Sequence, residues 1–185
     1  MNMKKWFLIC ILVVAYKKSV FAQSAPVSIY TIKIPLINET DTLNLSTWQA
    51  KKILIVNSAS QSNYVNQYSQ LEQLYQQFKD SGLVILACPS NNFGAEPYSN
   101  QQVQNFCSSG YGITYKLSRI VAVTGVSAHP LYQWLTQKNQ NGVVDNIIRN
   151  DFTKFLINGQ GQLVGFFDES INPLDAKVLA AIRAN

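Results

Sequence analysis

The stretch KILIVNSASQSNYVNQYSQLEQLYQQFKDSGLVILA, residues 52–87, decides the fold. It opens and closes with short apolar runs, at 52–56 and 83–87. Such runs are typical of strands that are buried on both faces of a parallel sheet. Between them, apolar residues recur at spacings of three and four, which indicates one buried helix face. These residues are Tyr68, Leu71, Leu74, Tyr75 and Phe78. The stretch therefore predicts a right-handed β-α-β unit, with a helix near 66–80 that Gly82 closes.

Two further runs predict a β-hairpin near the end of the chain. Residues 154–157 and 162–167 are mostly apolar and flank Asn158-Gly159-Gln160-Gly161, where glycine suits a tight turn. Near the start, residues 28–36 indicate a lead-in strand or hairpin arm, with its turn at 38–41.

Three more helices are predicted, at residues 100–107, 128–137 and 173–183. Asn172-Pro173 should cap the last of them, because proline suits the first turn of a helix. This order of elements predicts an α/β fold, with a central mixed β-sheet flanked by helices on both faces.

Residues 1–22 have the pattern of an export signal. Lys4 and Lys5 precede an apolar run of eleven residues, Trp6 to Tyr16, and small or medium residues then lead up to Ala22. This pattern predicts cleavage after Ala22. The protein is therefore expected to be exported, and to be periplasmic or extracellular.

Two other interpretations of this segment are less favoured. An uncleaved anchor would need about 20 apolar residues to span a bilayer stably, and the apolar run here has only eleven. A lipoprotein would need Cys10 at its processing site, but Cys10 lies inside the apolar run. The expected organisation is a signal peptide at 1–22 and one domain at 23–185, with no stable membrane span after cleavage.

The basic character of the chain belongs mostly to the signal. The net charge is +5, from 15 basic and 10 acidic residues, and the segment removed contains four of those basic residues. The mature chain then has 11 − 10 = +1. Without a basic cluster to contact phosphates, nucleic acid is not an expected partner.

Four stretches, in the same order and at nearly the same spacing, resemble the glutathione peroxidase family. They are 55–64 with Gln67-Tyr68, 89–94 with Glu96-Pro97, 111–114 with 128–132, and 151–157. The resemblance spans nearly the whole mature chain and implies a thioredoxin-like fold. It also implies a thiol-dependent reductase of hydrogen peroxide and organic hydroperoxides, acting in the oxidative stress response. Glutathione or thioredoxin would then be the reductant, with no bound cofactor.

Family members place a peroxidatic cysteine or selenocysteine beside a glutamine, a tryptophan and an asparagine. The matching positions here are Ser62, Asn92, Asn150 and Asp151, so all four residues are replaced. A serine oxygen cannot cycle through a sulfenic acid as a thiolate does. The Asp151 carboxylate would also oppose a thiolate by like-charge repulsion. The resemblance therefore implies a weak or inactive pseudo-peroxidase, in which Ser62 is more simply a helix-capping residue.

Cys88 and Cys107 remain after cleavage. Cys107 matches the resolving cysteine of thioredoxin-dependent family members, so an alternative function is a residual thiol peroxidase that uses Cys107 or Cys88. Both residues also fit apolar core positions, which is the simpler interpretation. One disulfide between them is possible in an oxidising compartment.

The single histidine, His129, lies at an expected helix start and is interpreted as structural. A serine hydrolase built on Ser62 is therefore disfavoured. One histidine and two dispersed cysteines give no metal-site spacing, so no metal is expected. Several tetrameric members of the family have extra loop material near 137–150, and no long insertion stands out there in this chain, so the resemblance implies a monomer.

Overall fold

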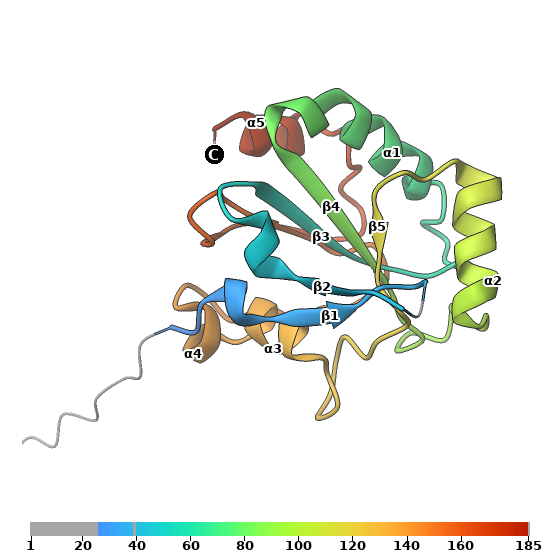
Figure 1. The fold of residues 1–185 in the computed structure, drawn as a ribbon, viewed down its shortest axis with the longest axis horizontal. Helices are drawn as coiled ribbons and strands as arrows, with labels where there is room; N and C mark the ends of the chain where they lie inside the picture. The colour runs from blue at the N-terminus through green and yellow to red at the C-terminus, as the bar shows by residue number, and fades with distance from the viewer. Residues whose placement is uncertain (1–25, 39, 185) are drawn as a thin grey trace, which may run out of the picture.

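The computed structural model describes residues 26–38 and 40–184. Its centre is a five-stranded sheet in the order β5-β4-β3-β6-β7 (Figure 1). The strands in that order are β5 (Lys116–Leu117), β4 (Leu83–Pro89), β3 (Lys52–Ser58), β6 (Lys154–Ile157) and β7 (Leu163–Phe167). β3, β4 and β5 are parallel, whereas β6 and β7 are antiparallel to their neighbours. The mixed sheet and the pairing of 52–56 with 83–87 are confirmed.

Helices cover both faces of this sheet, as predicted. On one face lie α1 (Gln67–Phe78), α2 (Asn100–Asn105) and α5 (Ala176–Ala184), which share one apolar cluster. On the other face lies α3 (Pro130–Thr136), together with a hairpin of β1 (Lys33–Pro35) and β2 (Thr42–Asn44). Short helical turns complete the chain: η1 (Ile29–Thr31), η2 (Leu45–Trp48), η3 (Lys79–Ser81), η4 (Phe106–Gly110) and α4 (Lys138–Asn141).

The position of β3 inside the sheet explains why its residues 53–56 are apolar without interruption. Successive side chains of a strand point to opposite faces of the sheet. Ile53 and Ile55 accordingly belong to the cluster on the α3 face, and Leu54 and Val56 to the cluster on the α1 face. Both faces are covered, so every side chain in the run is buried.

The structure corrects three details. α5 begins at Ala176, because Asp175 accepts a hydrogen bond from the amide of Lys177, whereas Asn172 only forms the preceding turn. The lead-in segment 28–36 contains η1 before its strand. β5 was not predicted, because two residues give no periodic signal.

The expected signal at 1–22 lies outside the described residues. In the described ranges, no helix is long and apolar enough to cross a membrane.

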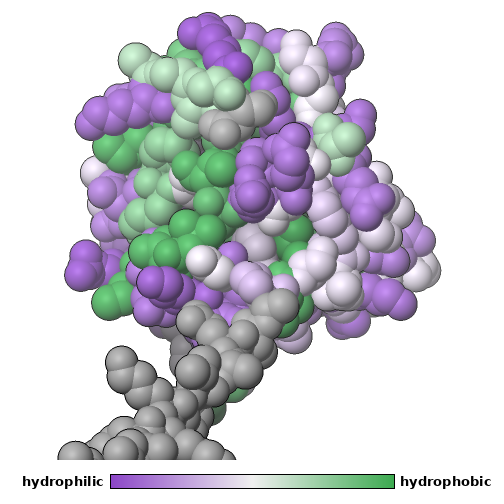
Figure 2. Space-filling view, turned by 90° about the vertical axis from the view of Figure 1, so that its left-hand side faces the viewer, coloured by the Kyte–Doolittle hydropathy of each residue, from purple (hydrophilic) through white to green (hydrophobic). Residues whose placement is uncertain are grey.

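Figure 2 shows apolar side chains gathered on one face of the molecule. Three partly exposed valines, Val27, Val143 and Val164, line a groove that has no charged lining residue.

Candidate active site

Three segments meet beyond the carboxyl end of β3. The loop after β3 is joined to the loop after β4 by a hydrogen bond from the Gln61 amide to the carbonyl of Ala95, at 2.9 Å. The turn before β6 is joined to β3 by the amide of Phe152, which donates to the carbonyl of Asn57 at 2.6 Å. Carboxyl ends of parallel strands share one edge of a sheet, and ligand sites commonly form there.

Ser62 is buried in this loop, with 6% of its surface exposed. Its hydroxyl oxygen accepts a hydrogen bond from the amide of Tyr64 at 3.2 Å. α1 begins only at Gln67, after Asn66. Ser62 therefore stabilises the turn that precedes α1, and the prediction that it caps the helix itself is wrong.

Asp151 lies next to Ser62, although the two are far apart in sequence. The Asp151 side chain is 1% exposed, and this burial raises the pKa of its carboxyl to about 6. Hydrogen bonding with the Ser62 hydroxyl lowers that pKa, and the charge of Glu96 raises it. The structure therefore brings two of the four predicted site residues together.

Asn150 and Asn92 shape the adjacent loops. The Asn150 side-chain oxygen accepts from the amide of Asp151 at 2.9 Å. The Asn92 side-chain oxygen accepts from the amide of Val123 at 2.7 Å and from the hydroxyl of Ser90 at 3.0 Å. The side-chain oxygen of Asn92 thus binds the loop that follows β4 to the segment at Val123.

Glu96 is a buried carboxyl that the sequence analysis treated only as part of a motif. It is 2% exposed, and its Oε2 accepts from the amide and the hydroxyl of Ser60, at 2.9 and 2.8 Å. Burial raises the pKa of Glu96. Glu96 follows the end of β4 by seven residues, so it lies at the same edge of the sheet as Ser62. This short spacing after a predicted strand could have identified Glu96 as a site residue from the sequence.

Lys154 is also buried, with none of its surface exposed, and the sequence analysis assigned it no role. Its Nζ donates to Gln67 Oε1 at 2.8 Å and to the carbonyl of Phe152 at 2.7 Å. Burial lowers the pKa of Lys154 to about 7. This ammonium therefore joins the start of α1 to the turn that contains Asp151.

Cys88 and Cys107 are free thiols in separate apolar clusters. Because these clusters lie on opposite faces of the sheet, the two cysteines cannot pair, and the possible disulfide is not formed. Burial raises the pKa of Cys88 to about 11 and that of Cys107 to about 12. Neither thiol is activated as a nucleophile, because the thiolate is the reactive form.

His129 caps α3 through Nδ1, which accepts from the amide of Leu131 at 3.2 Å. Burial lowers the pKa of this imidazole. Its structural role is confirmed, and Nδ1 is not free to act as a base. Within residues 26–38 and 40–184, no three His, Cys, Asp or Glu side chains converge in a metal-site arrangement.

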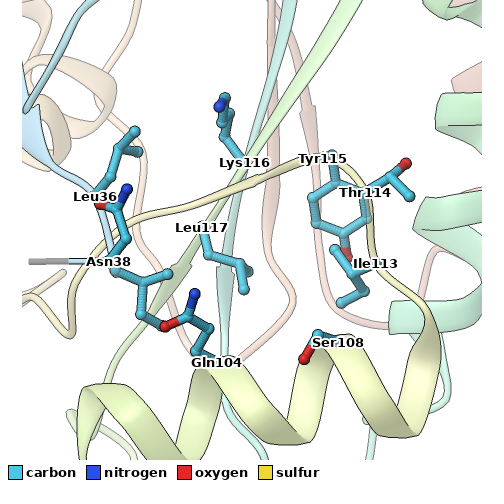
Figure 3. A pocket seen from close by; sticks show the side chains of 10 residues that line it. Leu36, Asn38, Gln104, Ser108, Ile113, Thr114, Tyr115, Lys116 and Leu117 are labelled. Carbon is cyan, nitrogen blue, oxygen red and sulfur yellow. The ribbon is translucent and has the colours of Figure 1, made fainter. Parts of the chain in front are cut away.

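A separate pocket lies between β5 and the helical segment at Gln104 and Ser108 (Figure 3). Leu117 projects from the strand toward Gln104 and Ser108 on the helix, whereas Lys116 points away from the helix. None of the four predicted site residues lines this pocket.

Solved structures of other proteins share the fold of this chain. A thioredoxin family protein of Chlorobium tepidum TLS, a thiol:disulfide interchange protein, matches the fold with a TM-score of 0.59 at 15% identity, covering 86% of this chain and 98% of that one. The crystal structure of Trgpx in apo form has a TM-score of 0.66 at 28% identity, covering 86% and 97% of the two chains. The fold is thioredoxin-like.

The family follows from the sequence matches. A profile of the family described as glutathione peroxidase matches residues 29–136. The glutathione peroxidase homolog BsaA of Bacillus subtilis (strain 168) is 35% identical over 147 residues, which cover 79% of this chain and 91% of that protein. This chain belongs to the glutathione peroxidase family.

Proposed function

We propose that this protein is a pseudo-peroxidase, a family fold kept as an exported binding or scaffolding module. The observation that carries the proposal is the contact of Ser62 with Asp151, at the position that the resemblance matches to the family's peroxidatic residue. Peroxide reduction needs a thiolate that attacks the O–O bond and becomes a sulfenic acid. A serine oxygen cannot be oxidised to a sulfenic acid, so a neighbouring carboxylate that accepted its proton would still not complete this cycle.

The polar surroundings also differ from those that peroxide reduction requires. Charge that develops on a leaving oxygen is stabilised by prearranged hydrogen-bond donors. Here Asp151 supplies an acceptor, and the amide oxygen of Asn92 is bound to the amide of Val123. The site is therefore better suited to binding than to reducing a hydroperoxide.

The alternative is a residual thiol peroxidase through Cys107 or Cys88. It is supported by relatives that are named as peroxidases, such as the glutathione peroxidase-like peroxiredoxin gpx1 of Schizosaccharomyces pombe. Burial of both thiols opposes it, because a pKa of about 11 or about 12 leaves little thiolate at neutral pH. Glutathione or thioredoxin would be the reductant in this case, without a bound cofactor.

We also propose export to the periplasm or the extracellular space, with a mature domain of 23–185 that acts as a monomer. The support is the signal-like segment 1–22 and the short loop after Gln137. Intact-mass spectrometry of the exported protein should give the mass of a chain that begins at Gln23, and light scattering should give the monomer mass.

The deciding experiment measures hydrogen peroxide consumption by the reduced mature protein, both stoichiometrically and coupled to glutathione or thioredoxin. The proposal expects a rate no higher than that of the double variant Cys88→Ser/Cys107→Ser. Coupled turnover that disappears in Cys107→Ser would instead establish the residual peroxidase.

A further inference from the structure

The strand β7 lies at one end of the central sheet, where β6 pairs with one of its edges and, within residues 26–38 and 40–184, no strand pairs with the other. Every second residue of such a strand directs its backbone N–H and C=O groups away from the sheet. Edge strands are commonly protected by charged side chains, prolines or bulges. Residues 159–167 contain no charge and no proline, and the register shift of β7 lies at its start, between Leu163 and Gly165. The outer edge of β7 is therefore available for pairing with a further extended segment.

Apolar side chains accompany this open edge. Val164 and Phe166 are 38% and 40% exposed. Val164 also lines the groove of about 580 Å³ that contains Val27 and Val143, and neither the groove nor the strand has a charged residue. Exposed apolar surface of this kind marks an interaction site. The surface next to an open strand edge fits an extended segment with uncharged, apolar side chains.

The carboxyl end of β7 is acidic. Asp168 and Glu169 directly follow Phe167, and Asp168 is exposed. Lys154 is opposite Phe167 in the ladder, but none of its surface is exposed, so it presents no charge to a ligand. Opposite charges on neighbouring strands favour pairing and fix its direction. A ligand strand antiparallel to β7 should therefore have basic residues at its amino end, beside the two acids, and apolar residues after them.

A segment of this chain that lies outside the described residues has this pattern. In the expected export signal, Lys4 and Lys5 precede the uncharged apolar run Trp6 to Tyr16. The run begins with tryptophan and phenylalanine and contains isoleucine and valine, all of which favour strands. The segment therefore complements both the apolar edge of β7 and its acidic end.

The segment also lies within reach of β7, because the chain enters the domain at the groove. The carbonyl of Val27 accepts from the indole of Trp134 at 2.7 Å, and the amide of Val27 donates to the carbonyl of Gln140 at 2.9 Å. Pro26 lines the groove beside the start of β7. Residues 17–25 can span roughly 30 Å when extended. β7 has five residues and extends about 17 Å, so this connection is long enough to bring the apolar run alongside it.

We propose that, before cleavage, residues 4–12 pair with the open edge of β7 as a further antiparallel strand, with their two lysines beside the two acids that follow β7. The apolar run then covers the exposed apolar side chains of the edge and the adjoining groove. The expected cleavage site after Ala22 lies in the connecting segment, outside the paired part. Removal of the signal therefore opens the edge and the groove, so this binding surface becomes available only in the mature chain.

This inference rests on the proposed export of a binding module and is independent of peroxide chemistry. Export and pairing are measured separately. An exported chain that keeps residues 1–22 would contradict the proposed cleavage, whereas the cross-linking below tests the pairing alone.

The first test uses Cys10 as a cross-linking group, in the full chain 1–185 made by cell-free synthesis without membranes. Antiparallel pairing with Lys5 opposite Asp168 places Cys10 near the start of β7. Gln162→Cys, at an exposed position, should therefore form an intramolecular disulfide with Cys10 on mild oxidation. Gln101→Cys, at an exposed position of α2, is the matched control and should not. Peptide mapping by mass spectrometry identifies the linked pair.

The second test compares amide hydrogen exchange in β7 between the full chain and the mature chain 23–185. Pairing should slow the outward-facing amides of residues 163–167 by about tenfold in the full chain. The double change Asp168→Asn/Glu169→Gln should reverse part of this protection, whereas Asp80→Asn, at an exposed acid elsewhere, should not.

Three results would overturn the proposal. They are equal cross-linking of Cys10 to both introduced cysteines, equal exchange of β7 in the two chains, or a mature chain that dimerises in light scattering and loses the dimer in Phe166→Lys. The last result would assign the open edge to a second copy of the chain.

Discussion

The Nζ of Lys154 donates a 2.7 Å hydrogen bond to the carbonyl of Phe152, a residue whose backbone has a φ of 63°. A bulky residue with positive φ is strained by about 1–3 kcal/mol and persists only where its surroundings hold it. Phe152 is held on both sides, since its amide also donates to the carbonyl of Asn57 at 2.6 Å. The buried Nζ of Lys154 therefore fixes the turn that directs Asp151 toward Ser62.

The first prediction concerns the protonation of Lys154. Burial lowers the pKa of Lys154 from 10.5 to about 7, so between these values the unfolded chain binds the proton and the folded chain does not. Stability then rises with pH in this window, by up to about 1.4 kcal/mol per pH unit for one proton. Urea unfolding at pH 7.5 and 9 should show this rise in the wild type relative to Lys154→Met.

The matched control is Lys177→Met, at an exposed position, which should keep the pH dependence of the wild type. Parallel curves for the wild type and Lys154→Met would show that Lys154 has an ordinary pKa in the folded protein.

The second prediction restores sulfur at the site. Ser62→Cys should regain only part of a peroxidase activity, because the neighbouring Asp151 carboxylate opposes thiolate formation. Ser62→Cys combined with Asp151→Asn should exceed the single change by about tenfold, since one pKa unit corresponds to about 1.4 kcal/mol. Stopped-flow peroxide reduction measures both rates, and equal rates would mean that Asp151 does not influence the new thiol.

The third prediction concerns the native thiols. With pKa values of about 11 and about 12 and complete burial, Cys88 and Cys107 should not react with Ellman's reagent in the folded protein at pH 8. Both should react within minutes in 6 M guanidinium chloride, a denaturing concentration. Rapid reaction of one thiol without denaturant would contradict the buried placement.

The fourth prediction tests the role of Asn92. Asn92→Ala removes the acceptor of the Val123 amide and should cost about 1 kcal/mol of stability, the usual net value of such a hydrogen bond. Hydrogen exchange should speed up at Val123. Asn63→Ala, at an exposed asparagine, is the control and should leave both quantities unchanged.

Much of the fold could be predicted because its signals are local. The apolar runs at 52–56 and 83–87 became β3 and β4, and the helical stripe between them became α1. The start of α5 was misplaced by three residues, because Asn172 and Asp175 are both suitable turn and cap residues. Sequence spacing cannot decide which of two such side chains meets the helix amides.

The sequence by itself determined the family fold and the presence of serine at position 62, since both depend on residue type and local pattern. Only the tertiary structure decided that Glu96 and Asp151 are both buried, that Lys154 holds the strained turn, and that Cys88 and Cys107 lie on opposite faces of the sheet. The physical reason is that burial and charge proximity depend on contacts between segments tens of residues apart, which no local periodicity encodes.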